Sequence, residues 1–269
     1  MTVAPVAASV AGYREWGPPP ALARHVACTW AGRMGPGGET YVRRVLPDAC
    51  IDIVWDGDRL VVAGPDTGPV DVTPRPDGFF VGIRFRPGMA PAVLGVPASE
   101  LLDLRVDLSD VVGTERTDRL ARRLSVELEA APPTGTPSSL RAVATSMEEA
   151  LLEWLPAFAG PDPLVEAAVA ALGSRAGVRP VAYLADRLGV SERHLHRRCR
   201  AAVGYGPKTL DRVLRFRRFL ALAEARPHTG LARLAADAGY ADQSHLSREC
   251  GRLAGTTPAA LLPELRQAV

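Results

Sequence analysis

The hydrophobic and polar positions of this chain follow two different periods. Between residues 39 and 85, short runs of β-prone residues are separated by Pro, Asp and Gly, which favour turns. The predicted strands are Thr40–Leu46, Cys50–Trp55, Arg59–Ala63, Val70–Val72 and Phe79–Phe85. Short strands at regular spacing are typical of an antiparallel sheet or a small barrel. We therefore predict a β-rich domain over residues 1–113.

The hydrophobic period becomes helical after residue 113. Leu120, Leu124 and Leu128 lie four residues apart, and a second helical pattern runs from Leu140 to Leu155 after a Pro-rich break. We interpret residues 114–160 as a helical hairpin that connects two domains. About seven helices are predicted for residues 161–269. The expected fold class is α+β, with a small antiparallel β-barrel or cupin-like domain, the helical connector and an all-α C-terminal domain.

The C-terminal region contains an internal repeat. Equivalent residues, 50 or 51 positions apart, are Leu184 and Leu234, Gly189 and Gly239, Leu195 and Leu246, Arg197 and Arg248, Cys199 and Cys250, and Gly204 and Gly255. Each copy combines an apolar-rich helix, a Gly turn and a second helix with Arg on one face. This is the pattern of a helix-turn-helix, so we predict two such units. A long helix over Pro207–Ala225 is predicted to lie between them.

The charge distribution favours a nucleic-acid partner for this region. The net charge is only +2, but residues 161–269 hold 17 Arg and Lys against 10 Asp and Glu. The remaining 15 basic and 20 acidic residues lie in residues 1–160. A basic C-terminal region (+7) on an acidic remainder (−5) fits a DNA-binding domain joined to a different domain. A solvated Arg-rich surface would give the same balance, so charge alone does not decide.

The second helix of each predicted unit has an apolar and a polar face. Leu195 and Cys199 are four residues apart and share one face, as do their repeat equivalents. The opposite face carries side chains that can donate hydrogen bonds to base edges or phosphates. The candidate DNA-contacting residues are Arg193, His196, Arg197, Arg200, Gln243, Ser244, Ser247 and Arg248. Surface ion pairs are the alternative role for Arg197 and Arg248, and their recurrence in the repeat favours DNA contact.

On these motifs, the segment from about Pro180 to Leu262 resembles the DNA-binding domain of the AraC/XylS family of transcription regulators. The resemblance implies a sequence-specific, ligand-responsive regulator that reads bases with both recognition helices. It implies double-stranded promoter DNA as a partner. Further candidate partners are RNA polymerase, an unidentified small-molecule effector and a second copy of the chain. The chain departs from the family pattern at Cys199 and Cys250, where the family usually has an aromatic residue. Glu249 adds a negative charge that we expect near phosphates.

The N-terminal half resembles an uncharacterised sensor-type domain that often precedes such DNA-binding domains. The resemblance rests on the stretch from Arg44 to Trp55, on Ala63-Gly64-Pro65 and on the stretch from Gly82 to Gly88. It implies a cupin-like fold and regulation, but names no ligand. Candidate pocket residues are Trp30, Asp48, Asp52, Trp55, Arg84 and Arg86. The alternative is that the Trp residues belong to the core and that Asp48 caps a turn.

Other function classes have weaker support in the sequence. His25 is the only histidine before residue 194, and the four cysteines are widely spaced, so we expect no metal site and no cofactor. No nucleophile–base pair or phosphate-binding loop is evident, and we expect no enzymatic activity. The alternatives are a DNA-repair regulator with a four-cysteine zinc module, which needs clustered cysteines, and a sequence-indifferent DNA-binding protein. Without a signal peptide or a run of 18 apolar residues, the chain is expected to be cytoplasmic and not membrane-bound.

Overall fold

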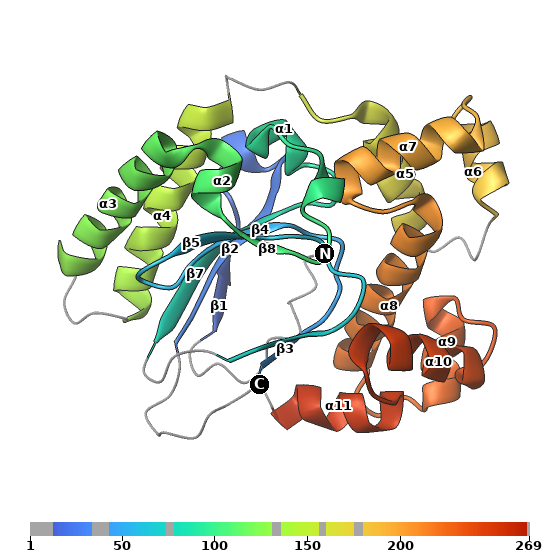
Figure 1. Cartoon of the computed structure of the whole chain (residues 1–269). Helices are drawn as coiled ribbons and strands as arrows, with labels where there is room; N and C mark the ends of the chain where they lie inside the picture. Colours follow the sequence, from blue (N-terminus) through green and yellow to red (C-terminus); the bar gives the residue numbers. More distant parts are fainter. Residues whose placement is uncertain are drawn as a thin grey trace.

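The N-terminal part of the chain is built on an antiparallel sheet. The computed structural model describes residues 13–33, 43–73, 78–130, 136–155, 160–174 and 180–267. A six-stranded sheet has the order β1 (Arg14–Trp16), β2 (Val26–Arg33), β7 (Phe79–Phe85), β4 (Asp52–Trp55), β5 (Leu60–Ala63) and β8 (Arg105–Asp107), and β3 (Arg43–Val45) pairs with β6 (Val70–Val72) in a separate sheet (Figure 1). All pairings are antiparallel. The α+β class and the antiparallel β domain are confirmed.

Strand positions agree with the sequence pattern where turn residues bracket a run. The five predicted strands correspond to β3, β4, β5, β6 and β7. The sequence pattern did not predict β1, β2 or β8. In the part of the chain that the structure describes, β1 and β8 are the two edges of the larger sheet, so its hydrogen bonds form an open sheet and not a closed ring.

One face of the large sheet is covered by a helical hairpin. The helices α3 (Thr114–Ala130) and α4 (Pro137–Trp154) pack against each other, and α4 lies on β2 and β7 (Figure 1). Alternate strand residues such as Ile53 and Ile83 enter a core shared with Leu124 and Met147 of the hairpin. Short helical segments complete this part of the chain: η1 (Pro20–Leu22), α1 (Pro91–Leu94), η2 (Ala98–Glu100) and α2 (Leu108–Val112).

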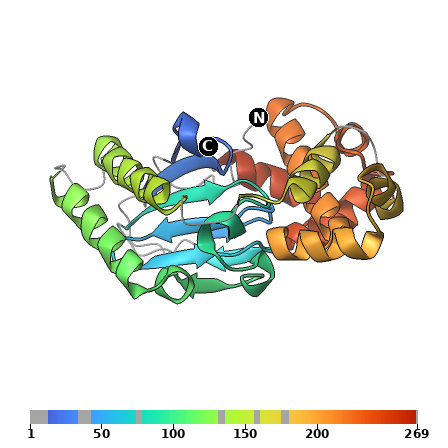
Figure 2. The ribbon, with the colours of Figure 1, turned by 90° about the horizontal axis from the view of Figure 1, so that it is seen from above.

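The C-terminal part forms helices wherever the structure describes regular elements in it, as predicted. Over its described residues it contains seven helices: α5 (Pro163–Gly173), α6 (Val181–Arg187), α7 (Glu192–Val203), α8 (Pro207–Ala225), α9 (Leu231–Ala238), α10 (Gln243–Ala254) and α11 (Pro258–Gln267). The α3–α4 hairpin and these helices lie on opposite sides of the β domain (Figure 2). No helix among the described residues is long and apolar enough to cross a membrane.

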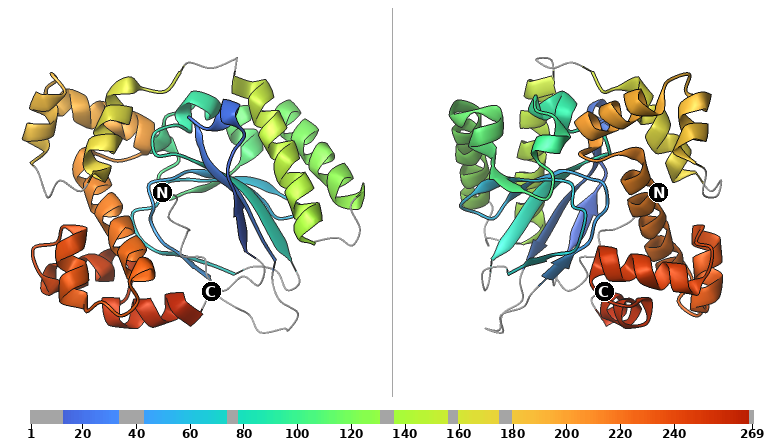
Figure 3. Two further views of the ribbon diagram at one scale, coloured as in Figure 1. Left: turned by 180° about the vertical axis from the view of Figure 1, so that it is seen from behind. Right: turned by 45° about the vertical axis from the view of Figure 1, so that its right-hand side comes forward.

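The two parts of the chain share a hydrophobic core. Leu46 and Ala49, from the segment between β3 and β4, are buried with residues of the C-terminal helices, among them Phe216 of α8. Figure 3 shows the orange helix α8 running from α6 and α7 on one side to α9 and α10, nearer the red end of the colour scale, on the other. The position of the β domain is therefore fixed against both groups.

Candidate nucleic-acid interface

The first helix-turn-helix unit consists of α6 and α7. Leu184 and Ala185 of α6 are buried against Leu195 and Cys199 of α7. Gly189 makes the turn with a φ of +67°, which favours glycine. The hydroxyl of Ser191 then accepts a hydrogen bond from the main-chain N–H of His194, and this cap begins α7.

The second unit, α9 and α10, repeats this construction. Leu234 and Ala235 pack in one core with Leu246 and Cys250. Gly239 makes the turn at a φ of +92°, and the Asp242 carboxylate caps α10 by accepting from the N–H of His245 at 2.6 Å. The repeat in the sequence is therefore a repeat in structure.

Most of the candidate DNA-contacting side chains are exposed. The exposed ones are Arg193, His196, Arg197, Arg200, Gln243, Ser244 and Arg248, whereas Ser247 is half-buried. The Ser247 hydroxyl donates to the main-chain oxygen of Gln243 at 3.0 Å. Arg197 Nη2 lies 3.2 Å from His194 Nδ1. The His196 ring lies against the backbone of Gly206, where a Cβ would be 2.5 Å from its Cδ2.

The helix α8 separates the two units and is anchored in the core. Leu210, Val213, Phe216 and Phe219 are fully buried on it. A helix of 19 residues at ~1.5 Å rise per residue is about 28 Å long. Adjacent major-groove segments on one face of B-DNA are roughly 34 Å apart. The length of α8 is thus on the scale that two recognition helices require.

Ion pairs at equivalent repeat positions attach each recognition helix to its neighbours. Arg198 of α7 pairs with Asp162, which also caps α5. Glu249 of α10 is buried and accepts from Arg212 Nε of α8 at 2.7 Å. The expectation that Glu249 lies near phosphates is therefore wrong, because its carboxylate is turned into the domain.

The two departures from the family pattern are accommodated inside the domain. Cys199 and Cys250 are both fully buried. Burial raises the pKa of Cys199 to about 11 and that of Cys250 to about 12, so neither is a reactive thiolate at neutral pH. Both residues act as small apolar side chains of the core.

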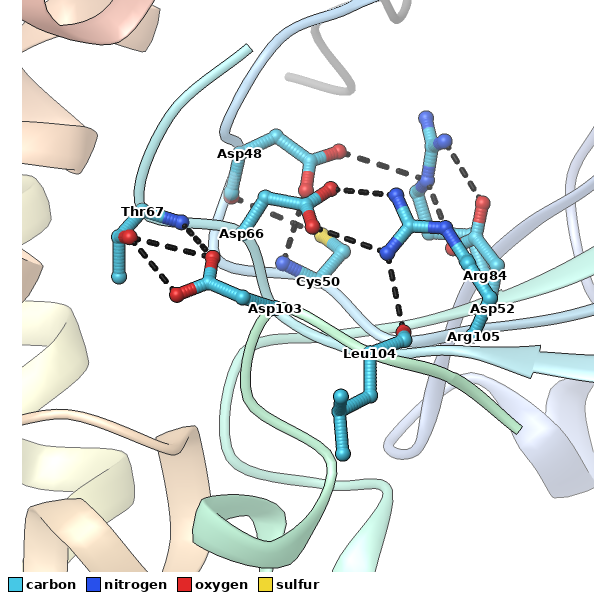
Figure 4. Close-up of polar contacts among 9 residues, drawn as sticks. All are labelled: Asp48, Cys50, Asp52, Asp66, Thr67, Arg84, Asp103, Leu104 and Arg105. Carbon is cyan, nitrogen blue, oxygen red and sulfur yellow. Dashed lines mark hydrogen bonds and ion pairs between the residues drawn. The ribbon is translucent and has the colours of Figure 1, made fainter. Parts of the chain in front are cut away.

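Four of the six candidate pocket residues meet on the sheet face that the α3–α4 hairpin does not cover. Arg84 donates to both carboxylate oxygens of Asp52, from Nε at 3.0 Å and from Nη2 at 2.8 Å. Trp30 Nε1 donates to the same carboxylate at 3.2 Å. Asp48 Oδ2 lies 3.5 Å from Arg84 Nε, and Figure 4 shows both carboxylates beside this guanidinium. Burial raises the pKa of the Asp52 carboxyl, and the charge of Arg84 opposes this shift.

The remaining two candidates lie elsewhere. Trp55 is buried on the opposite face of the sheet, where its ring packs edge-on against Phe79 at 5.5 Å. Arg86 is exposed, and its Nε donates to the main-chain oxygen of Ala23 at 2.9 Å. Asp48 also caps a turn, which was the alternative role that the sequence left open, since its Oδ1 accepts from the N–H of Cys50 at 2.9 Å.

A second polar cluster, beside the first, was not predicted. Asp66 is buried and accepts from Arg105 Nη1 and Nη2 at 2.9 and 2.7 Å. Asp103 accepts from the N–H of Thr67 at 2.6 Å (Figure 4). No local motif links these residues, which are 36 to 39 positions apart. Among the described residues, no group of three His, Cys, Asp or Glu side chains could hold a metal ion.

Two family models match separate parts of the chain. Residues 14–107 match a domain of unknown function, DUF6597, and residues 184–263 match a helix-turn-helix domain. No curated protein sequence matches the chain.

Solved structures of ToxT from Vibrio cholerae are similar at low identity. The apo form of a single-substitution variant from strain SCE256 has 10% identity and a TM-score of 0.49, and ToxT from strain O395 has 12% identity and a TM-score of 0.44. Each comparison covers 88% of this chain and 97% of the ToxT chain. The matched domains and the geometry of the two helix-turn-helix units, and not this likeness, identify the class of the protein. This chain is a DNA-binding transcription regulator that joins an AraC-type helix-turn-helix domain to a domain of the DUF6597 family.

Proposed function

We propose that α7 and α10 each enter a major-groove segment of promoter DNA and read its base edges. The observation that carries this proposal is the two-faced construction of both helices. Each buries its Leu and Cys in the domain and exposes Arg on the other side, at Arg197 and Arg248. Arg can form bidentate hydrogen bonds with guanine, and Gln243 can do so with adenine.

Selection of genomic fragments by the purified full-length protein tests this proposal. We expect a motif with two contacted segments about one helical turn apart. Arg197→Ala or Arg248→Ala should each weaken binding to this motif by about 1–3 kcal/mol and relax the preference at one base pair. Arg122→Ala, an exposed Arg on α3, is the control and should leave affinity unchanged. Equal losses on random DNA would reject base reading by these arginines.

We further propose that the N-terminal domain binds a small, polar, uncharged effector at Trp30, Asp52 and Arg84. Arg84 Nη1 is buried and makes no hydrogen bond to the described residues, so it can donate to a ligand oxygen. Asp48 and Asp52 already balance the charge of Arg84, which disfavours an anionic ligand. The Trp30 indole lies flat over Gly82, where a Cβ would be 2.5 Å from Trp30 Cε2.

A thermal-shift screen of uncharged polar compounds tests the effector site. A true effector should raise the unfolding temperature of the wild type and of Arg86→Lys, the exposed control. It should have no effect on Trp30→Phe, which keeps the aromatic ring and loses the indole N–H. A hit that stabilises all three proteins equally would place the ligand elsewhere. We also propose that the protein self-associates and that it contacts RNA polymerase at the promoter. Sedimentation tests the self-association, and co-purification on promoter DNA tests the contact with RNA polymerase.

A further inference from the structure

The C-terminal ends of both recognition helices face one loop of the β domain. Gly204 ends α7 and Gly255 ends α10, and the two are equivalent in the repeat. A Cβ on Gly204 would lie 2.6 Å from Cγ of Pro65, and a Cβ on Gly255 would lie 3.4 Å from Cγ of Pro69. We call residues 64–69 the bridging loop, because it lies beside the same position of both helix-turn-helix units.

The bridging loop is held firmly by its own domain. Asp66 forms the bidentate ion pair with Arg105, and the Thr67 hydroxyl donates to Asp103 Oδ2 at 2.8 Å (Figure 4). The N–H of Gly64 donates to the main-chain oxygen of Leu104 at 2.9 Å. Bidentate pairs of a buried carboxylate fix orientation as well as distance. The loop is therefore a rigid part of the β domain, and not a free connection.

The position of these contacts matters for DNA binding. Both glycines lie at the helix ends away from Arg193 and Gln243, which are at the N-terminal ends where base contacts are expected. The first unit is fixed further because Gly204 also packs on the main-chain oxygen of Ala98. Two recognition helices must keep the separation and the rotation that one duplex imposes. Apart from α8, the bridging loop is a second physical connection between the two units.

We propose that the bridging loop is a brace that sets the relative orientation of the two recognition helices. On this view, the N-terminal domain determines which spacing between half-sites the protein accepts, without touching DNA. Pro65 and Pro69 are then positioning residues for spacing specificity. This inference rests on the proposed function, because spacing has meaning only if both helices read DNA.

The test compares the full-length wild type with the double variant Pro65→Ala/Pro69→Ala. Duplexes carry the selected motif with its natural spacing and with one or two base pairs inserted or removed between half-sites. We expect the preference of the wild type for its natural spacing to fall about tenfold in the double variant, with affinity for a single half-site unchanged. Pro20→Ala, an exposed proline of η1, should retain the wild-type profile. An unchanged profile in a folded double variant would overturn the proposal.

A second measurement separates failure of the brace from failure of DNA reading. Spin labels at Arg193→Cys and Ser244→Cys report the distance between the two recognition helices without DNA, since the four native cysteines are buried. The distance distribution should be narrow in the parent protein and broad in the double variant. Thr67→Val loses only the hydroxyl bond to Asp103 and should broaden the distance distribution partly. This variant replaces the double variant in the test if the double variant does not fold. Equal distance distributions in all folded variants would overturn the brace, even if promoter binding is confirmed. A broadened distribution in the double variant, together with no sequence-specific binding by the wild type, would instead reject the proposed DNA reading.

Discussion

Arg217 donates a hydrogen bond from Nη1 to the main-chain oxygen of Asp48 at 3.0 Å. Arg217 belongs to α8, the helix between the two recognition helices, and the carboxylate of Asp48 faces Arg84 in the proposed effector site. The neighbouring Ala49 has a φ of +67° and is buried with the C-terminal helices. A non-glycine residue in this conformation needs support from its surroundings. The segment around Asp48 therefore connects the buried polar cluster to the DNA-binding domain.

Arg217→Ala should weaken this connection. The side chain loses a charge-assisted hydrogen bond to a partly buried main-chain oxygen, which is worth roughly 1.5–3 kcal/mol. We expect the free energy of unfolding, measured by urea denaturation, to fall by about this amount, while Arg122→Ala leaves it unchanged. If an effector is found, its affinity should be retained and its influence on DNA binding reduced. A variant as stable as the wild type would show that the Asp48 oxygen finds another donor.

Glu249→Gln should destabilise the second unit more than substitution of its exposed partner Arg252 does. Glu249 is 7% exposed and accepts from both Arg212 and Arg252. Removal of its charge leaves the half-buried Arg212 guanidinium without its anion, and breaking such a pair costs about 3 kcal/mol or more when fully buried. Arg252→Ala, whose side chain is 62% exposed, should cost less than about 1 kcal/mol. Urea denaturation of both variants measures the two losses in the free energy of unfolding. Equal losses would mean that Glu249 contributes no more than a surface ion pair does.

The degree to which the sequence predicted these features depends on how local their signals are. The strand β4 could be predicted because Pro47-Asp48 and Asp56-Gly57 bracket it, and α8 could be predicted because Pro207 begins it. The strand β2 was missed because its sequence, VACTWAGR, does not alternate between apolar and polar residues. The separation of Trp55 from Asp52 follows from strand period, since residues three apart point to opposite faces. The internal pairing of Glu249 depends on the path of α8, which no local pattern encodes.

The buried thiols should be inert in the native protein. Burial raises the pKa of Cys28 and Cys250 to about 12 and that of Cys199 to about 11. A raised pKa in the folded state favours the neutral thiol, so this contribution to stability is complete below about pH 9 and is lost as the pH rises toward 11–12. At pH 8 an aromatic disulfide reagent should label no thiol rapidly, and all four should react in urea. Rapid labelling of one thiol in the native state would show that its site opens without global unfolding.

Gly204→Ala should cost far more than Gly189→Ala, although both glycines have positive φ values. The shared cost is the backbone strain of an L residue in this region, of order 1–2 kcal/mol. At Gly189 a Cβ would meet no atom within 4 Å, whereas at Gly204 it would lie 2.6 Å from Pro65 and 3.2 Å from the main-chain oxygen of Ala98. The excess cost at Gly204 is therefore steric. Pro65→Ala should recover part of it by removing the nearer atom, and the same substitution should not rescue Gly189→Ala. If urea denaturation gives equal costs for the two glycines, with no effect of Pro65→Ala, then the bridging loop does not press on α7 in solution.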